Sequence, residues 1–552
     1  MRGRDVLLDV LRTEGVRHIF GNPGSTELPL IDALASAEDL HYVLALQEAT
    51  AVGMADGYAQ ATGRPAFLNL HTSAGLGNAI GNLTNARACL TPLVVTAGQQ
   101  DYRHIVTDPL LAGDLTGIAG AVSKWAHEVR TTDELGTVLR RAFHDAMSPP
   151  SGPVFVSMPM DLLEGSTDTP VPGPSTVHRR PVADGLDVLA RLLSSETAGK
   201  IAIVAGDEVA QADAVSELVA VAEALAAPVY GSPLHGNAVF PPAHPLWNGM
   251  LAPAAAAVHA TLAAYERVLL VGGRAFMAYP YTPGPALPHT VELLHLSPDP
   301  YQLGRVYPTR WASAGDPKAS LAALLPIISA QVEKAGARHA ITDAMTEASM
   351  RRRKAIEELE VTALSRYDSA PMDPMAAAHA LVRAMPPGSL IVDEAITTGV
   401  YVRGFHHQSV PGRYFFCPGG GLGWGMPAAC GVSLGHDREP VLCVVGDGSA
   451  MYSPQALWTA AHERLPVIFA VVNNREYRIL KNNLRGMRGD STRTERFVAM
   501  DIEDPPVDYV SLAESMGVEA ALVEKATDVA DAVQTALDDG GPRLLELPIA
   551  SG

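Results

Sequence analysis

The stretch Val441-Leu-Cys-Val-Val-Gly-Asp-Gly-Ser449 decides the fold of this chain. Its apolar, largely β-branched half is typical of a strand buried on both faces of a parallel sheet, and that strand ends in Gly446-Asp-Gly-Ser449. Ser453-Pro454 then predicts the start of a helix, with the serine as N-cap and the proline in the first turn. A second apolar run, residues 466–472, predicts a neighbouring strand that ends in Asn473-Asn474.

These two strand ends would place a carboxylate, a carboxamide and a glycine-lined turn side by side, because parallel strands end at the same edge of a sheet. Mg²⁺ is a hard cation that prefers oxygen ligands, and the start of a helix offers backbone N–H groups to a phosphate. The pattern therefore predicts a diphosphate bound together with Mg²⁺ near Asp447 and Asn474. It resembles the thiamin diphosphate (ThDP) signature, in which Gly-Asp-Gly is followed one strand later by Asn-Asn.

The composition is that of an ordinary globular protein with several domains. The chain has 552 residues, of which 47% are hydrophobic and 18% charged, and this length predicts about 3–4 domains. Its formal net charge of −19 argues against nucleic acid or an anionic membrane as the main partner. No apolar run is long enough to span a membrane and the N-terminus does not resemble a signal peptide, so we expect a cytoplasmic protein. The cysteines show no metal or redox spacing and are expected to be reduced core thiols: Cys89, Cys417, Cys430 and Cys443.

Strand–helix repeats predict an α/β fold with three doubly wound parallel-sheet domains. Short apolar runs in residues 1–180 each precede a Gly/Ala-rich or amphipathic segment, which predicts a sheet with helices on both faces. The proline-rich stretch Thr169-Pro-Val-Pro-Gly-Pro174 is a candidate linker. A second α/β domain is expected over residues 185–330, a charged helical linker over residues 331–370, and a third α/β domain over residues 371–552.

Polar residues that follow the predicted strands of the first domain are candidate site residues, because ligands bind beyond the carboxyl ends of parallel strands. They are Ser25, Glu48 and His71. Each also has a structural interpretation: Ser25 as a helix cap, His71 as a core imidazole and Glu48 as an exposed acid. Glu48 fits this interpretation least, because the apolar helix start that follows would bury it, and a buried carboxylate is costly unless it is paired or protonated.

Over nearly its full length the sequence resembles the ThDP-dependent decarboxylase superfamily, and within it most closely the benzoylformate decarboxylases. The matching segments are, in order, Phe20-Gly-Asn-Pro-Gly-Ser25, Leu44-Ala-Leu-Gln-Glu-Ala49, Ala55-Asp-Gly-Tyr-Ala-Gln60, Leu68-Asn-Leu-His71, Val95-Thr-Ala-Gly-Gln-Gln100, Gly420-Gly-Leu-Gly423, Gly446-Asp-Gly-Ser449 and Ala456-Leu-Trp-Thr-Ala-Ala461. The resemblance implies pyrimidine-binding, central and diphosphate-binding domains, with ThDP held between the first domain of one subunit and the third of its neighbour. A dimer is then the minimum assembly, and a homotetramer is expected.

The reaction that this resemblance implies is Mg²⁺-dependent, non-oxidative decarboxylation of a benzoylformate-like 2-keto acid to an aldehyde, through a C2 carbanion and an enamine. Glu48 would activate the cofactor by proton exchange with its aminopyrimidine ring. Ser25 and His71 would bind the substrate carboxylate and move protons. The second catalytic histidine of the family is missing, and Tyr279 falls at or beside its position. A phenol keeps its proton at neutral pH, so it can donate a hydrogen bond but is a poor proton shuttle.

The resemblance also assigns the metal and cofactor contacts. Asp447 and Asn474 would bind Mg²⁺, for which Ca²⁺ can substitute, and a backbone carbonyl near Glu476 would be a third ligand. Leu422 would be the apolar prop that holds the cofactor bent. The remaining cofactor-binding residues would be Thr397, Gly420, Gly448, Ser449 and Tyr477.

Three polar residues depart from the benzoylformate type, because Arg478, Lys481 and Asn483 stand where small and aromatic residues are usual. Either the substrate pocket is more polar or these side chains point to solvent. A carboligase of the acetolactate-synthase type and a decarboxylase of an aliphatic or anionic 2-keto acid therefore stay open. Acetolactate synthases usually bind FAD through the central domain, where Val271-Gly-Gly-Arg274 is a weak match to a dinucleotide fingerprint. A catalytically silent assembly subunit is a remote alternative, against which the intact activator and metal-binding residues argue.

Overall fold

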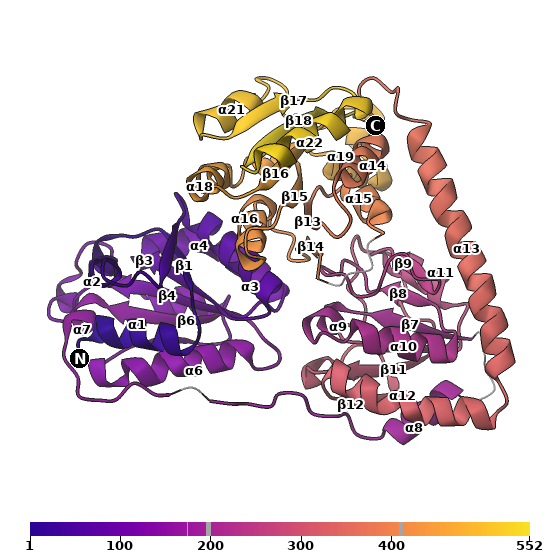
Figure 1. Ribbon diagram of the computed structural model, residues 1–552, viewed down its shortest axis with the longest axis horizontal. Helices are drawn as coiled ribbons and strands as arrows, with labels where there is room; N and C mark the ends of the chain where they lie inside the picture. Colours follow the sequence, from indigo (N-terminus) through magenta and orange to yellow (C-terminus); the bar gives the residue numbers. More distant parts are fainter. Residues whose placement is uncertain (174, 195–199, 408–411, 552) are drawn as a thin grey trace.

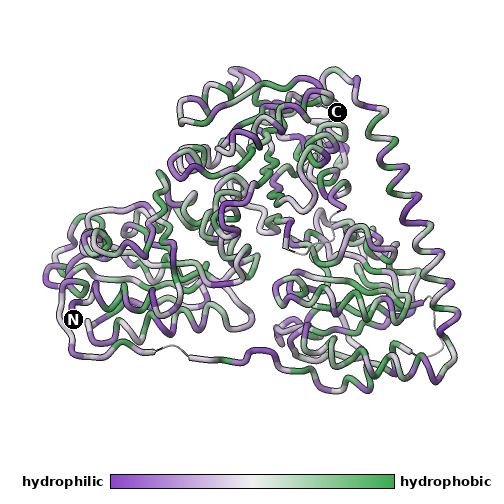
Figure 2. Tube along the Cα trace, viewed as in Figure 1, coloured by the Kyte–Doolittle hydropathy of each residue, from purple (hydrophilic) through white to green (hydrophobic). Residues whose placement is uncertain are grey.

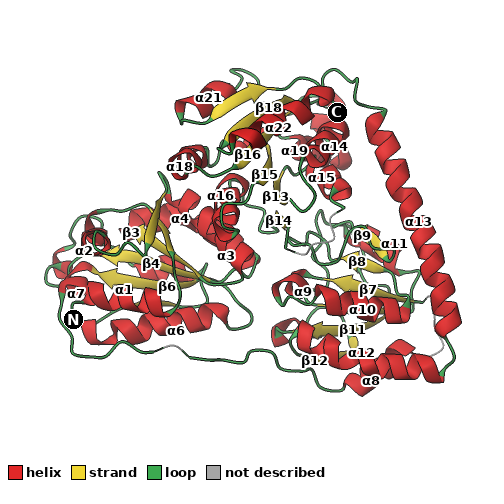
Figure 3. Ribbon diagram, in the orientation of Figure 1, coloured by secondary structure: helices red, strands yellow, loops and turns green. Residues whose placement is uncertain are grey.

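The computed structural model describes residues 1–173, 175–194, 200–407 and 412–551. These residues form three six-stranded sheets that follow one another along the chain, each all-parallel and covered by helices (Figures 1 and 3). We call the parts built on them the first, central and third units. The predicted α/β fold with three doubly wound parallel sheets is confirmed. None of the helices in the described ranges is both long and apolar enough to cross a membrane.

The first unit has the strand order β2-β1-β3-β4-β6-β5. Its strands are β1 (His18–Gly21), β2 (His41–Leu44), β3 (Ala66–His71), β4 (Leu93–Gln99), β5 (Ala126–Glu128) and β6 (Val154–Pro159). Its helices are α1 (Gly3–Thr13), the 3₁₀ turn η1 (Ser25–Glu27), α2 (Leu28–Leu34), α3 (Glu48–Thr62), α4 (Thr72–Ala88), α5 (Leu115–Gly120), α6 (Leu135–Met147) and α7 (Met160–Glu164).

The central unit has the order β12-β11-β10-β7-β8-β9. Its strands are β7 (Ile201–Ala205), β8 (Val229–Gly231), β9 (Trp247–Met250), β10 (Arg267–Val271), β11 (Glu292–Ser297) and β12 (Thr309–Ala314). Its helices are α8 (Leu186–Ser194), α9 (Asp207–Gln211), α10 (Val215–Leu225), α11 (Ala255–Leu262) and α12 (Pro317–Lys334). Two separate apolar clusters occupy the two faces of this sheet, as a doubly wound fold requires.

The third unit has the order β14-β13-β15-β16-β18-β17, which is the order of the first unit again. Its strands are β13 (Leu390–Glu394), β14 (Tyr414–Phe416), β15 (Val441–Gly446), β16 (Val467–Asn473), β17 (Glu519–Leu522) and β18 (Arg543–Pro548). Its helices are α14 (Pro374–Ala384), α15 (Gly399–Phe405), α16 (Gly425–Gly435), α17 (Asp447–Ala450), α18 (Gln455–Glu463), α19 (Arg478–Met487), α20 (Asp490–Thr494), α21 (Tyr509–Ser515) and α22 (Val529–Asp539).

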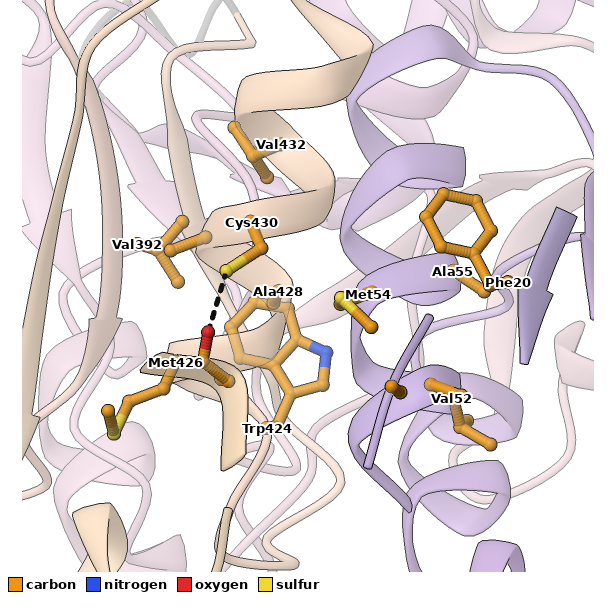
Figure 4. Packing of buried hydrophobic residues seen from close by; sticks show 14 of the residues in the cluster. Phe20, Val52, Met54, Ala55, Val392, Trp424, Met426, Ala428, Cys430 and Val432 are labelled. Carbon is orange, nitrogen blue, oxygen red and sulfur yellow. Dashed lines mark hydrogen bonds between the residues drawn. The ribbon is translucent and has the colours of Figure 1, made fainter. Parts of the chain in front are cut away.

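The first and third units share one apolar core, which runs through the packed helices α3 and α16 (Figure 4). Phe20 and Met54 from the first unit and Trp424 from the third are buried in it. The two backbones approach closely where Gly431 lies against Met54, since a Cβ at Gly431 would be 1.9 Å from the Met54 carbonyl oxygen. Any larger residue there would push the helices apart. The relative position of these two units is therefore fixed by tight packing rather than by a linker.

Two connections join the units. Residues 167–173 and 175–183, around the predicted linker, have no regular structure and lead from the first unit to the central unit (Figure 1); Pro174 itself lies outside the described residues. Helix α13 (Arg338–Leu364) runs along the outside of the molecule towards the third unit and alternates polar and apolar residues (Figure 2). Only Ala348 and Ala363 of this helix are buried. It contains the basic run Arg351-Arg-Arg-Lys354, of which Arg352 donates to the Pro242 carbonyl.

Candidate active site

The third unit contains a cavity at the carboxyl edge of its sheet. The cavity lies beyond the ends of β13 and β15, where the strand order reverses, and this is the usual ligand position in such folds. The segments after β13, β15 and β16 line the cavity together with Leu422. Its lining includes most of the residues predicted for cofactor and metal: Thr397, Leu422, Asp447, Gly448, Ser449, Asn474, Glu476 and Tyr477. The sequence prediction that these strand ends meet is therefore confirmed.

Asp447 is the most unusual group in this cavity. Its side chain is buried at the start of α17, and its Oδ2 has no hydrogen-bond partner among the described residues. Burial raises the pKa of this carboxyl to about 6, against the effect of backbone N–H donors at Gly448, Arg475 and Glu476. A buried carboxylate without a counter-charge is unfavourable, so a cation beside Asp447 would remove a real energetic cost.

The neighbouring oxygens fit a hard cation. The Asn474 side-chain oxygen accepts from the Glu476 N–H at 3.1 Å and has a second lone pair, and the Glu476 carbonyl accepts from the Arg478 N–H at 2.9 Å. Carboxylate, carboxamide and carbonyl oxygens are the ligands that Mg²⁺ accepts. Within the described ranges there is no cluster of three or more His, Cys, Asp or Glu residues that could hold a metal alone. The candidate ligand set is thus one acid supported by neutral oxygens.

The three polar residues of α19, Arg478, Lys481 and Asn483, have different surroundings in the structure. Lys481 is buried and forms ion pairs with Glu476 and Asp501, so it serves to neutralise Glu476. Arg478 lines the cavity and pairs with Glu476 at 3.3 Å. Asn483 donates from Nδ2 to the Tyr279 hydroxyl at 3.1 Å, which links α19 to a loop of the central unit.

The first unit gathers its predicted residues at the same switch point of its own sheet, between β1 and β3. His71 ends β3, and its Nδ1 lies 2.8 Å from a side-chain oxygen of Glu27. Because a carboxylate only accepts, Nδ1 carries a proton, and in the neutral ring Nε2 holds the lone pair. The hydrogen bond to Glu27 raises the pKa of His71, while partial burial opposes the shift. The exposed Ser25 begins the η1 turn just ahead of Glu27.

Both carboxylate oxygens of Glu27 accept hydrogen bonds, whereas Asp447 Oδ2 has no partner among the described residues. The Glu27 oxygens accept from the Gly24 and Gly98 N–H groups at 3.0 and 2.9 Å and from the Thr26 hydroxyl at 2.7 Å, besides His71. The backbone at Gly24 lies directly on the imidazole, since a Cβ there would be 2.2 Å from the ring. Glu27 was not among the residues predicted for the site. Its bond to the Gly24 N–H is an ordinary helix-start interaction, and an acid at a helix start gives no sign of a second partner.

Glu48 is the first residue of α3 and is buried, as the sequence predicted. One of its oxygens accepts from Asn78 Nδ2 at 3.0 Å. The helix is capped by the preceding residue, because the Gln47 side chain accepts from the Thr50 N–H. Ser25, Glu48, His71 and Tyr279 do not line the third-unit cavity of their own chain. The predicted residues of the two outer units therefore form two separate groups, which we call half-sites, and Tyr279 belongs to the central unit.

Comparison with known proteins identifies all three units. Residues 1–118, 186–324 and 397–547 match the N-terminal thiamine pyrophosphate-binding domain, the central domain and the C-terminal thiamine pyrophosphate-binding domain of thiamine pyrophosphate enzymes. A benzoylformate decarboxylase of Pseudomonas aeruginosa is 33% identical over 98% of this chain and 97% of its own length. The chain belongs to the thiamine pyrophosphate (ThDP) enzyme family. Within that family it is similar to both decarboxylases and acetolactate synthases.

Two further relatives illustrate this range. The acetolactate synthase isozyme 3 large subunit of Escherichia coli is 29% identical over 94% of this chain and 89% of its own length. The solved structure of a 4-hydroxybenzoylformate decarboxylase from Rhodococcus jostii RHA1 superimposes with a TM-score of 0.87 at 29% identity, covering 100% of this chain and 99% of that one. The chain is therefore a ThDP-dependent enzyme of the decarboxylase, acetolactate synthase and carboligase group.

In this ThDP enzyme, the loop of residues 417–425, which we call the cofactor loop, is ordered by a residue that the sequence did not reveal. Glu394 at the end of β13 is buried and accepts from the N–H groups of Gly423, Trp424 and Gly425 at 2.8, 3.2 and 2.8 Å. Burial raises its pKa to about 7, although these donors act in the other direction. The predicted N-cap role of Ser453 is wrong. Helix α18 has Pro454 as its N-cap, and the Ser453 hydroxyl instead donates to the Gly423 carbonyl at 2.8 Å.

Proposed function

We propose that this enzyme is a Mg²⁺-dependent decarboxylase of a 2-keto acid of the benzoylformate type, releasing an aldehyde. The observation that carries the proposal is the His71–Glu27 pair at 2.8 Å beside Ser25, because it supplies a positioned proton-transfer group and a hydroxyl for a small acid. ThDP, when bound, would supply a nucleophilic carbon and an electron sink for decarboxylation. The resemblance in sequence to a benzoylformate decarboxylase supports the same choice.

The third unit would hold the charged end of the cofactor. Asp447, Asn474 and the Glu476 carbonyl would bind Mg²⁺, and Ser449 and Tyr477 would line the diphosphate. Thr397, Gly420, Leu422 and Gly448 would complete the binding surface. The unpartnered oxygen of Asp447 supports this assignment, because a divalent cation would offset the energetic cost of burying that carboxylate and would also neutralise a diphosphate.

The first unit would supply the proton-transfer groups. Glu48 would exchange a proton with the aminopyrimidine ring, and Asn78 keeps its carboxylate in one orientation. His71 Nε2 would move the proton to or from the keto oxygen, while Glu27 fixes the ring through Nδ1. Ser25 would bind the substrate carboxylate through its hydroxyl. Because these residues do not line the cavity of their own chain, we infer that the first unit of a second copy completes each site, so a dimer is the minimum and a homotetramer is our proposal for the assembly.

A flavin-dependent acetolactate synthase is less well supported. A dinucleotide would place its phosphates at the carboxyl ends of β7 and β10, where the central strand order reverses. Asp207 and Glu208 stand there, the first partly buried and the second buried, and both are acids that would oppose a pyrophosphate. Asp207 already accepts from the Gly236 and Asn237 N–H groups at 2.7 and 2.9 Å. The absorbance spectrum of the purified protein tests this point, and a bound flavin would reverse our preference.

Carboligation is the second candidate. Relatives of the benzoylformate type are expected to have a histidine at the position of Tyr279, whose hydroxyl here accepts a hydrogen bond from Asn483. Slow final protonation would let a second aldehyde be captured as a 2-hydroxy ketone. A panel of aromatic, aliphatic and dicarboxylic 2-keto acids, assayed for CO₂, aldehyde and hydroxy ketone, decides between these functions. Release of CO₂ and aldehyde from aromatic substrates is expected. Hydroxy ketone as the sole product, with no aldehyde, would overturn the proposal.

A further inference from the structure

Helix α4 carries a polar stripe that faces two functional regions at once. Asn78, Asn82, Asn85 and Cys89 follow one another at spacings of four, three and four residues, which places them on one side of the helix. Asn82 and Asn85 are buried, although buried carboxamides are unfavourable unless every polar atom finds a partner. We call Asn78, Asn82 and Asn85 the α4 stripe. Their partners show what the stripe does.

The N-terminal part of the stripe holds the start of α3. Asn78 Nδ2 donates to the Glu48 carboxylate at 3.0 Å. Asn82 Nδ2 donates to the carbonyl of Ala49, the next residue, at 2.7 Å. Two successive residues of α3 are thus bound by side chains from one face of α4. The orientation of the Glu48 carboxylate depends on this contact, because Asn78 is the hydrogen-bond donor that reaches it in the described structure.

The C-terminal part of the stripe holds the cofactor loop of the third unit. Asn85 makes two bonds with Gly421, donating to its carbonyl at 2.9 Å and accepting from its N–H at 3.0 Å. Asn82 reaches the Gly423 carbonyl at 3.4 Å, and Asn85 donates to the Asn82 side-chain oxygen at 3.0 Å. The Cys89 and Cys417 sulfur atoms lie 3.4 Å apart at the end of the same face. The stripe therefore connects the cofactor loop to the Glu48 end of α3 through side chains alone.

We propose that Asn78, Asn82 and Asn85 are positioning residues that set the Glu48 carboxylate and the cofactor loop from one rigid helix. The inference rests on the proposed ThDP function, since Glu48, Gly420 and Leu422 have roles only towards that cofactor. Residues that act through another group in this way are usually worth roughly 10–100-fold in affinity or rate. A purely structural role would change the stability of the fold without changing either cofactor affinity or proton exchange.

The test compares three variants of the full-length protein. Asn85→Ala removes both bonds to Gly421, and Asn78→Ala removes the donor to Glu48. Thr84→Ala is the control, because Thr84 is exposed on the same helix and its hydroxyl donates to the Ile80 carbonyl within that helix. ThDP is titrated into each apo protein in Mg²⁺ by calorimetry. The rate of hydrogen–deuterium exchange at thiazolium C2 is then measured at saturating ThDP, and the melting temperature of each apo protein is recorded.

We expect Asn85→Ala to bind ThDP roughly 10-fold more weakly than Thr84→Ala, and Asn78→Ala to bind normally but exchange the C2 proton roughly 10-fold more slowly. Equal affinity and equal exchange in all three variants would overturn the positioning role. If Asn85→Ala does not fold, Asn78→Ala decides alone, and an exchange rate equal to that of Thr84→Ala refutes the inference. Absence of ThDP binding by the wild-type protein would instead remove the proposed function itself, so the two failures are distinguishable.

Discussion

The first and third units have the same strand order and place their candidate site residues at the same switch point, yet the carboxylates of Glu27 and Asp447 have opposite surroundings. In the first unit, Glu27 accepts hydrogen bonds from two backbone groups, a hydroxyl and His71. In the third unit, the Oδ2 of Asp447 is buried without a partner among the described residues. One unit is electrostatically complete and suited to hold a proton-transfer group. In the other, the unpartnered carboxylate oxygen is suited to the metal and diphosphate that we propose for this cavity.

The largest effect is expected from the complete half-site. His71→Ala should lower turnover per bound ThDP by roughly 10²–10⁴-fold, because it removes the proton-transfer group and leaves cofactor binding intact. His41→Ala is the matched control, since His41 is a half-exposed histidine of the same unit that pairs with Glu463 at 2.8 Å. Steady-state turnover, normalised to thiamin content, measures the difference. Equal turnover in the two variants would mean that His71 is a structural imidazole.

Asp447→Ala should lower ThDP affinity in Mg²⁺ by roughly 100-fold, because the metal loses its only anionic ligand from the proposed set. The apo protein should lose little stability, because the loss of an acceptor for the backbone donors at Gly448, Arg475 and Glu476 is offset by the removal of a buried carboxylate oxygen that lacks a partner. Calorimetric ThDP titrations and apo melting curves measure both effects. An apo protein that is strongly destabilised, with normal ThDP affinity, would show that Asp447 is a structural group.

Glu27→Gln should have the opposite signature, with a loss of apo stability of about 2 kcal/mol and unchanged ThDP affinity, because several buried donors lose a charged acceptor. It should also change the pH dependence. The raised folded-state pKa of His71 gives stability that is full below the unfolded value of about 6.5 and is lost as the pH rises through the folded value. Urea unfolding of the apo proteins across this range measures the slope. A variant that keeps the wild-type slope would show that Glu27 does not raise the pKa of His71.

Tyr279→His should give the smallest effect, a shift of a few-fold in product ratio from 2-hydroxy ketone towards aldehyde. A histidine can deliver a proton near neutral pH, whereas the tyrosine hydroxyl is engaged by Asn483. Asn483→Ala controls for loss of that contact alone. The two products are measured at equal CO₂ release with added aldehyde, and an unchanged ratio would mean that Tyr279 has no role in proton transfer.

The sequence predicted the third unit well because its signals are local. Apolar runs that end in Gly446-Asp447 and in Asn473-Asn474 fix the strands, and parallel strands must bring those ends together. The apolar run of residues 466–472, which was predicted to be a strand, is β16 (Val467–Asn473) in the structure. The partners of Glu27 and Asn85 could not be predicted in this way. Their contacts join residues far apart in the chain, and neither an acid at a helix start nor an asparagine within a helix indicates its partner.

The most direct test of the contrast between the two units is C2 hydrogen–deuterium exchange on bound ThDP in Glu48→Gln. The glutamine keeps the size of the side chain and can still contact the pyrimidine ring, but it cannot exchange the proton. We expect ThDP affinity close to that of the wild type, because the third unit binds the charged end of the cofactor. We expect exchange slowed by roughly 10²–10⁴-fold, because the first unit supplies the proton-transfer group. A wild-type exchange rate in this variant would contradict the account.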